Sequence, residues 1–233
     1  MLASLQRWFA PKPRLTAEQE ARLAAWIALP AVDAKASHLR CVVVDVETTG
    51  LNLMTDTLIS IGAVAVVNGR IALGDSFYVV LQQREASRKE NILIHGISGT
   101  VQREGADPVE ALLAFLEFMG KSPLVAFHVT FDETMIRRAL RQYLGLKLKH
   151  LWVDLAYVMP ALYPPLAYSH RVLDDWIGRF NIRIQVRHNA LADALATAQL
   201  LQVAQACAHK KGISSIASLR DLELQQRWVN GVS

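Results

Sequence analysis

The sequence predicts an α/β domain whose mixed central sheet is flanked by helices. Residues 41–81 read as three strands, because Asn68-Gly69 between two apolar runs is the strongest short signal for a β-hairpin. Further along, short apolar strands alternate with amphipathic helices, which is typical of a sheet covered by helices. We therefore expect an antiparallel meander that continues into strand–helix units.

The composition indicates a protein with a sizeable buried core. Hydrophobic residues make up 52% of the 233 residues, and the mean hydropathy is +0.20. The net charge of +4 is compatible with a polyanionic partner but does not demonstrate one. Cys41 and Cys207 are isolated and fit small core residues in a reducing compartment. The sequence shows no secretory signal, and its longest apolar stretch, residues 58–67, is too short to span a bilayer, so we expect a cytoplasmic protein with no membrane partner.

Residues 1–38 are predicted to form a helical N-terminal extension of the main domain. Thr16 and Gln19 have the spacing of a capping box, and Pro30 ends the helix that they open. The apolar stripe of this helix is expected to pack on the main domain, although a docking arm for a partner is an alternative. We assign residues 39–208 to the main domain and residues 209–233 to a C-terminal helix packed on it.

The other elements follow from local patterns. Polar residues 82–106 are expected to form an irregular loop with buried anchors. The segments that follow are a helix opened by Pro108, a strand at 123–127, a helix containing residues 135–143, a strand at 151–154, a helix from Leu173, a long apolar helix at 190–207 and a last helix at 213–228. In the last helix, Glu223 has the spacing to pair with Arg220 and Arg227.

Two acidic residues stand at the end of the first apolar strand. Asp45 and Glu47 alternate along that strand, so both side chains point to the same face. Two unpaired carboxylates there would repel each other, and a hard cation such as Mg²⁺ or Mn²⁺ would remove the repulsion. Gly50 lets the chain turn away after them. The simpler alternative is a strand that ends in polar residues at the sheet edge.

Two further segments carry candidate ligands. Asp132 follows a strand at the mouth of a helix, where a capping role is an equally good explanation. Asp193 lies near the start of an apolar helix, where its carboxylate needs a partner such as a metal ion. His188 precedes it on a loop, which suits a base that must reach a water molecule.

These segments resemble the three sequence motifs of the DEDDh 3′→5′ exonucleases, the superfamily of the proofreading subunit of bacterial DNA polymerase III. The motifs are Asp45-Val-Glu47-Thr48-Thr49-Gly50, His128-Val-Thr-Phe131-Asp132 and His188-Asn-Ala-Leu-Ala-Asp193. The resemblance covers roughly residues 40–207 and implies a ribonuclease H-like fold. One departure is His128, which stands where the family usually has Asn.

The resemblance also implies a mechanism. Asp45, Glu47, Asp132 and Asp193 would hold two Mg²⁺ or Mn²⁺ ions, with Asp45 bridging them, and His188 would take the proton of the attacking water. Two cations suit the reaction, because a phosphodiester is negatively charged and gathers more charge in its transition state. The products would be nucleoside 5′-monophosphates released from a 3′ end.

Substrate contacts are expected around the first two motifs, although ordinary loop anchoring explains several of these residues equally well. The expected contacts are Thr48, Thr49, Gly50, Leu51, His95, His128 and Phe131. Some of the basic residues that flank the motifs would bind phosphates, and they are Arg84, Arg88, Lys89, Arg103, Arg137, Arg138, Arg141, Arg171, Arg179, Arg183 and Arg187.

Three functions compete at this point. The first is an exonuclease acting on single-stranded or frayed DNA 3′ ends, alone or with a polymerase or repair partner. The second is a 3′→5′ exoribonuclease that trims RNA or oligoribonucleotides. The third is a non-catalytic nucleic-acid-binding module, which the retention of four carboxylates and the histidine disfavours.

Overall fold

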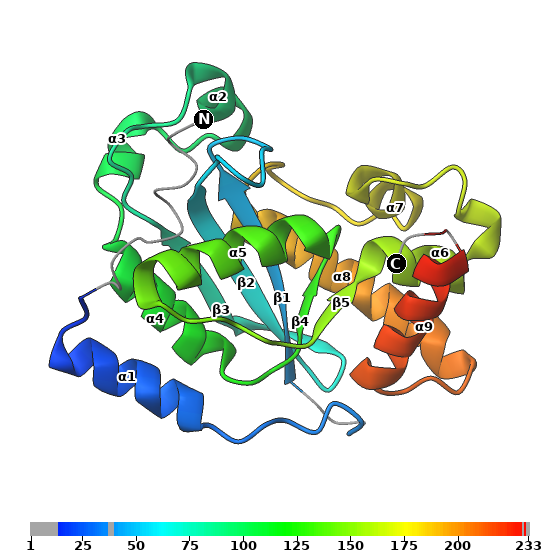
Figure 1. The fold of residues 1–233 in the computed structure, drawn as a ribbon. Helices are drawn as coiled ribbons and strands as arrows, with labels where there is room; N and C mark the ends of the chain where they lie inside the picture. The colour runs from blue at the N-terminus through cyan, green and yellow to red at the C-terminus, as the bar shows by residue number, and fades with distance from the viewer. Residues whose placement is uncertain (1–13, 37–39, 230, 232–233) are drawn as a thin grey trace.

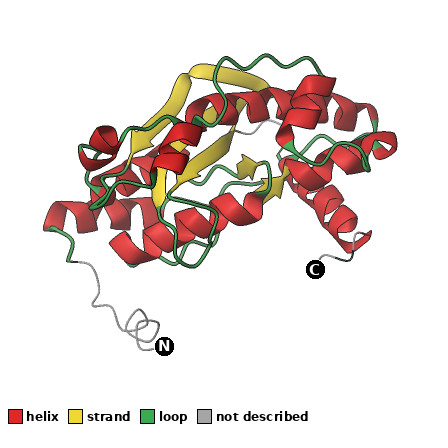
Figure 2. Cartoon of the chain, turned by 90° about the horizontal axis from the view of Figure 1, so that it is seen from above, coloured by secondary structure: helices red, strands yellow, loops and turns green. Residues whose placement is uncertain are grey.

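A five-stranded mixed sheet lies at the centre of the computed structural model, which describes residues 14–36, 40–229 and 231 (Figures 1 and 2). The strands are β1 (Arg40–Thr48), β2 (Leu58–Val67), β3 (Arg70–Val80), β4 (Leu124–Ala126) and β5 (Trp152–Asp154). Their order is β3-β2-β1-β4-β5. The first three strands pair antiparallel, and β4 and β5 join parallel to β1. The predicted meander and mixed sheet are therefore confirmed.

Helices cover both faces of this sheet (Figures 1 and 2). The helices are α1 (Ala17–Ala28), α2 (Lys89–His95), α3 (Gly99–Arg103), α4 (Pro108–Met119), α5 (Val129–Leu144), α6 (Leu155–Leu162), a 3-10 turn at Pro164–Leu166, α7 (Leu173–Arg179), α8 (Ala190–Lys210) and α9 (Ile216–Val229). Helices α4 and α5 lie in front of the sheet in Figure 1, and α8 lies behind it. Among the described residues, no helix is long and apolar enough to cross a membrane.

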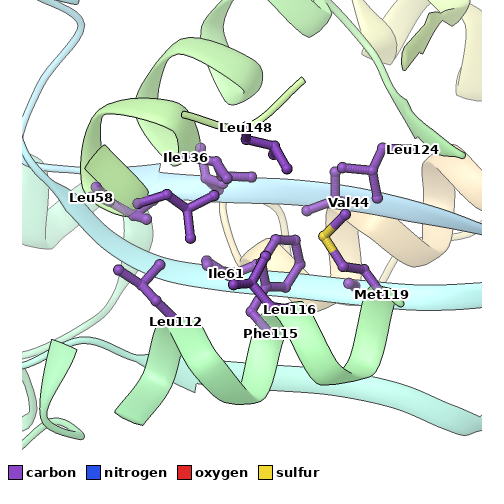
Figure 3. Packing of buried hydrophobic residues seen from close by; sticks show 14 of the residues in the cluster. Val44, Leu58, Ile61, Leu112, Phe115, Leu116, Met119, Leu124, Ile136 and Leu148 are labelled. Carbon is purple, nitrogen blue, oxygen red and sulfur yellow. The ribbon is translucent and has the colours of Figure 1, made fainter. Parts of the chain in front are cut away.

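The alternation of side chains along β1 divides the core in two. Val42, Val44 and Val46 join the cluster that α4 and α5 build on one face. Figure 3 shows this packing, in which four apolar side chains of α4 meet Val44 and Ile61 of the sheet. Cys41 and Val43 join the second cluster, which includes residues of α6, α8 and α9 on the other face. Asp45 and Glu47 continue this second series, so they point toward α8.

A glycine on β2 lets α8 come close to the sheet at this point. Gly62 pairs directly with Asp45 across the β1–β2 ladder, so the two residues share one face. A Cβ atom on Gly62 would lie 2.2 Å from the carbonyl carbon of Ala190, the first residue of α8. Only a glycine fits there without displacing the helix.

Helix α1 packs on α4, which belongs to the main domain. Thr16 and Gln19 form the expected capping box. The indole nitrogen of Trp26 donates a hydrogen bond of 2.9 Å to the carbonyl of Gly120, and Arg22 forms ion pairs with two glutamates of α4, Glu110 and Glu117. Residues 1–13 and 37–39 of the predicted extension lie outside the described residues.

One expectation about local structure was wrong, and one helix was not predicted. The segment 82–106 is not an irregular loop throughout, because it contains α2 and α3. Gly96, with φ of 71°, ends α2, and the hydroxyl of Ser98 accepts a hydrogen bond from the first turn of α3. Helix α6 was not predicted at all, since Pro160 interrupts its sequence pattern. The carboxylate of Asp154 caps its first turn.

Candidate active site

Three carboxylates from two distant segments meet beside the end of β1. Asp45, Glu47 and Asp193 each offer an oxygen atom, and these atoms lie within 4.8 Å of one another. The first two come from the face of β1 that points toward α8, and the third comes from the first turn of α8. The structure therefore brings together three of the four predicted ligands.

The start of α8 fixes the direction of Asp193. The side chain of Asn189 caps the helix by accepting a hydrogen bond of 3.1 Å from the backbone N–H of Ala192. The backbone N–H of His188 donates to Asp193 Oδ2 at 2.9 Å. His188 has φ of 58°, in the left-handed region, and its side chain is exposed. The predicted base thus stands next to a predicted ligand, with its imidazole at the surface.

Negative charge is crowded in this site. Burial raises the pKa of Asp45 well above its ordinary value, and the neighbouring charges of Asp132, Asp193 and Glu47 raise it further. Burial together with the charge of Asp193 raises the pKa of Glu47 to about 7. Burial also raises the pKa of Asp193, although Arg187 acts in the opposite direction. A divalent cation would stabilise the ionised forms, and carboxylate oxygens are the ligands that Mg²⁺ and Mn²⁺ prefer, so these residues fit the predicted metal.

Asp132 is not among the three carboxylates whose oxygen atoms lie within 4.8 Å of one another. It comes from α5, which lies on the opposite face of the sheet from α8 (Figure 1). It lies in the first turn of α5 and is only 4% exposed. Its burial raises its pKa, while hydrogen bonds from its own backbone N–H and from that of Val46 act in the opposite direction. Since its charge is among those that raise the pKa of Asp45, the fourth predicted ligand belongs to the same electrostatic cluster. It is not the residue at the cap position, which is His128.

The unusual histidine of the second motif adopts a backbone conformation that Asn also tolerates. His128 has φ of 66° and ψ of 52°, the left-handed region in which Asn, Asp and His are enriched. Its ring packs edge-on against Phe127, with 4.8 Å between the ring centroids. Its backbone N–H donates to Asp154 Oδ1 at 2.9 Å. The replacement of Asn therefore preserves the turn that opens α5.

Arg187 bridges the site to α7. Its guanidinium forms an ion pair with Asp193 and two hydrogen bonds, of 2.8 and 3.2 Å, with the carboxylate of Asp174. The sequence predicts Arg187 only as a candidate phosphate contact, and it predicts no role in the site for Asp174. In this structure Arg187 supplies positive charge beside the carboxylates.

The first-motif residues predicted to bind substrate shape the loop after β1. The hydroxyl of Thr48 donates to the carbonyl of Gly50 at 2.6 Å, and that of Thr49 donates to Asp56 Oδ1 at 3.0 Å. Leu51 is 84% exposed on the same loop. The two threonine hydroxyls thus hold the loop, while Leu51 presents an apolar side chain to solvent.

The remaining two predicted contacts point inward. His95 is only 5% exposed, and its Nδ1 accepts a hydrogen bond of 3.0 Å from the backbone N–H of Ile97. Phe131 packs against the core cluster on the α4–α5 face. These positions favour the alternative interpretation of both residues as anchors of the local structure.

The comparisons with known proteins agree with this site. Residues 42–201 match the family model described as exonuclease, of the RNase T type. The chain belongs to this exonuclease family. The match includes all three motifs, so the resemblance to the DEDDh exonucleases is confirmed, and this chain is an exonuclease-family nuclease.

Exonuclease relatives occur within much longer proteins. The chain is 33% identical over 173 residues to a PolC-type DNA polymerase III of Bacillus subtilis, and 35% identical over 159 residues to that of Listeria innocua. The matches cover 74% and 68% of this chain but only 12% and 11% of those proteins. The chain therefore corresponds to a small part of each polymerase.

Solved exonuclease structures share the fold. Exonuclease I of E. coli in complex with a dT13 oligonucleotide aligns with a TM-score of 0.62 at 17% identity, over 74% of this chain and 42% of that one. Exonuclease X in complex with 5′ overhanging duplex DNA aligns with a TM-score of 0.58 at 18% identity, over 78% of this chain and 99% of that one. At such identities the likeness establishes the ribonuclease H-like fold.

Proposed function

We propose that this exonuclease hydrolyses phosphodiester bonds one nucleotide at a time from the 3′ ends of single-stranded or frayed DNA, releasing nucleoside 5′-monophosphates. The observation that carries the proposal is the convergence of Asp45, Glu47 and Asp193 within 4.8 Å. Carboxylates whose pKa values are raised by burial and mutual repulsion are suited to gather divalent cations.

The metal would be held by the carboxylates of β1, α5 and α8. We assign Asp45, Glu47, Asp132 and Asp193 to two Mg²⁺ or Mn²⁺ ions. When bound, such ions supply positive charge that offsets the phosphate charge and lowers the pKa of water. The protein holds these ligands in place before the metal arrives, because β1 is a central strand and Asp193 is fixed by the backbone of His188.

His188 is the proposed proton acceptor. Its imidazole is exposed beside Asp193, where it can reach a water molecule next to the scissile phosphate. Imidazole suits this role, because its neutral form is available near pH 7. The water oxygen forms a bond to phosphorus as the bond from phosphorus to the leaving 3′ oxygen breaks. The water proton passes to an imidazole nitrogen, and the leaving oxygen takes a proton from solvent.

The loop after β1 is the proposed contact for the terminal nucleotide. Leu51 and Met54 are 84% and 75% exposed, although large apolar side chains are usually covered. Arg138 of α5 holds this loop with hydrogen bonds to the carbonyls of Asp56, at 2.9 Å, and Met54, at 3.0 Å. A base or sugar packed on Leu51 and Met54 would cover them without reading sequence.

The choice of DNA rests on the relatives. They are DNA polymerases by name, and two of the similar structures contain DNA. A polymerase or repair partner is proposed on the same basis, and the cytoplasm remains the expected compartment. RNA is the alternative substrate, and the experiment below separates the two.

The test is a time course on 5′-labelled single-stranded DNA and RNA of one sequence, with Mg²⁺, Mn²⁺ or EDTA. We expect a ladder that shortens from the 3′ end in the presence of metal, faster on DNA, and lost in Asp45→Asn and Asp193→Asn. Asp221→Asn, which changes an exposed carboxylate on α9, is the matched control and should retain activity. A terminal 3′ phosphorothioate should slow the first cleavage, which establishes the direction.

Two results would overturn the proposal. Equal activity in Asp45→Asn and the wild type would reject the metal site. A folded wild-type protein that binds the oligonucleotides but releases no nucleotide in either metal would favour a binding module. If RNA is shortened faster than DNA, the preferred substrate is RNA and the enzyme is a 3′→5′ exoribonuclease.

A further inference from the structure

One buried carboxylate outside the metal site holds the turn that carries the second motif. Asp154, at the end of β5, accepts hydrogen bonds from the backbone N–H groups of His128, at 2.9 Å, and Val129, at 3.1 Å. It also accepts one from Ala156, at 3.0 Å. Asp154 thus caps the N-termini of both α5 and α6. Because α5 lacks a side-chain cap of its own at His128, the start of this helix depends on Asp154.

Helix α9 holds Asp154 in turn. Arg227 donates from Nη2 to Asp154 Oδ2 at 2.9 Å and from Nε to Glu223 Oε1 at 2.8 Å. Glu223 Oε2 accepts a hydrogen bond of 2.9 Å from the backbone N–H of Asp154. Arg220 also forms an ion pair with Glu223. The C-terminal helix α9 therefore forms hydrogen bonds with both the backbone and the side chain of Asp154. Figure 1 shows α9, in red, on the side of the sheet where β5 lies.

This network is buried and leads directly to a proposed metal ligand. Asp154 is 1% exposed and Glu223 is 0% exposed. Asp154 accepts hydrogen bonds from the backbone N–H groups of His128 and Val129, and Asp132 lies one turn of α5 after these residues. The charge of Asp154 also contributes to the raised pKa of Asp132. A shift of Asp154 would therefore move the first turn of α5, and Asp132 with it.

A purely structural anchor for α9 would not need these charges. Helix α9 already buries Ile216 and Leu219 against the second core cluster. Two buried carboxylates carry a large desolvation cost, and apolar residues of similar size often stabilise a fold equally well. The network instead places the two carboxylate oxygens of Asp154 where they accept hydrogen bonds from the backbone of the second motif, at His128 and Val129.

We propose that Glu223 and Arg227 of α9 are positioning residues of the exonuclease reaction, which hold Asp132 in place through Asp154. The inference rests on the proposed function, because Asp132 matters here as a ligand of the metal. It makes the C-terminal helix part of the catalytic apparatus, although neither residue touches metal or substrate.

The test compares kinetics and stability in the full chain. We expect Arg227→Met and Glu223→Gln each to lower kcat on single-stranded DNA at least tenfold at saturating Mn²⁺. Each should leave KM for DNA within twofold of the wild-type value. Each should also raise the Mn²⁺ concentration that gives half-maximal activity. Arg227→Lys keeps a charge and should recover part of kcat. Leu219→Ala, which cuts a buried contact of the same helix, is the stability control, and Asp221→Asn is the surface control.

The outcomes separate positioning from stability. The proposal predicts that Leu219→Ala lowers Tm as much as the ionic variants do and yet retains kcat within twofold. Wild-type kcat and Mn²⁺ dependence in folded Arg227→Met and Glu223→Gln would overturn it, as would an equal loss of kcat in Leu219→Ala at the same Tm. If Arg227→Met does not fold, Glu223→Gln and Arg227→Lys decide by the same criteria.

A separate readout keeps this inference distinct from the proposed function. Binding of Mn²⁺ can be followed by electron paramagnetic resonance without any substrate. If the wild type releases no nucleotide, the proposed function fails, and the Mn²⁺ titration still tests the positioning of Asp132. Weaker binding in Glu223→Gln than in Asp221→Asn supports the inference, and equal binding in both refutes it.

Discussion

Glu47 provides a direct test of the charge crowding in the site. Its pKa is raised from 4.5 to about 7, so without metal the folded protein keeps this proton at pH values where the unfolded chain has lost it. The folded state then binds more protons than the unfolded state between these two pH values. The contribution of Glu47 to stability is therefore complete below pH 4.5 and is lost as pH rises toward about 7.

The size of this effect follows from the same values. One pKa unit corresponds to about 1.36 kcal/mol, so the interval from 4.5 to about 7 amounts to at most about 3 kcal/mol. Glu47→Gln removes the titration and keeps the shape of the side chain. The free energy of unfolding of Glu47→Gln, relative to wild type, should rise by about 2–3 kcal/mol between pH 4.5 and 7.5.

Urea denaturation in EDTA at four pH values between 4.5 and 7.5 measures this difference, because the titrations of groups that do not interact with Glu47 are the same in the two proteins and cancel. Glu85→Gln, which makes the same substitution at an exposed glutamate, is the control. Saturating Mg²⁺ should reverse the trend, since the metal binds the ionised carboxylates. A difference between Glu47→Gln and wild type that stays constant with pH would refute the reasoning.

Three further outcomes are expected. Asp193→Asn should weaken Mn²⁺ binding by calorimetry by about tenfold or more, because it removes one of the proposed ligands, and unchanged binding would remove Asp193 from the metal site. Arg138→Met should raise KM for single-stranded DNA severalfold with little change in kcat in steady-state kinetics, because its hydrogen bonds hold the loop of Leu51; a change confined to kcat would contradict this. Trp26→Phe should lower the free energy of unfolding by about 1 kcal/mol in urea denaturation, through the lost bond to Gly120, and should leave kcat unaltered.

The features that the sequence predicts well are those encoded within a few residues. The Asn68-Gly69 turn and the capping box of α1 each depend on neighbouring residues, and both appear in the structure. The alternation of Asp45 and Glu47 along β1 is equally local, and it places both side chains on the face that meets α8. Short-range geometry was therefore sufficient for this half of the proposed metal site.

The features that the sequence did not reveal depend on contacts between distant residues. Asp154 was predicted only as the last residue of the strand at 151–154, because its partner Arg227 lies 73 residues away in the sequence. His95 was expected at the substrate, but only the fold shows that its ring turns inward toward Ser87 and Ile97. The position of Asp154 at the end of an apolar strand was a signal that could have identified it, because Asp45 was identified as a candidate from the same kind of position.

Gly62 shows how a residue without a functional group can become as irreplaceable as a ligand. Its missing side chain sets how closely the first turn of α8 can approach the strand opposite Asp45, and therefore the separation between Asp193 and Asp45. In a saturation mutagenesis screen for nuclease activity, we expect position 62 to tolerate no other amino acid, much like the carboxylates themselves. Such a screen would mark Gly62 as essential, although its contribution is the empty space that lets two chain segments meet.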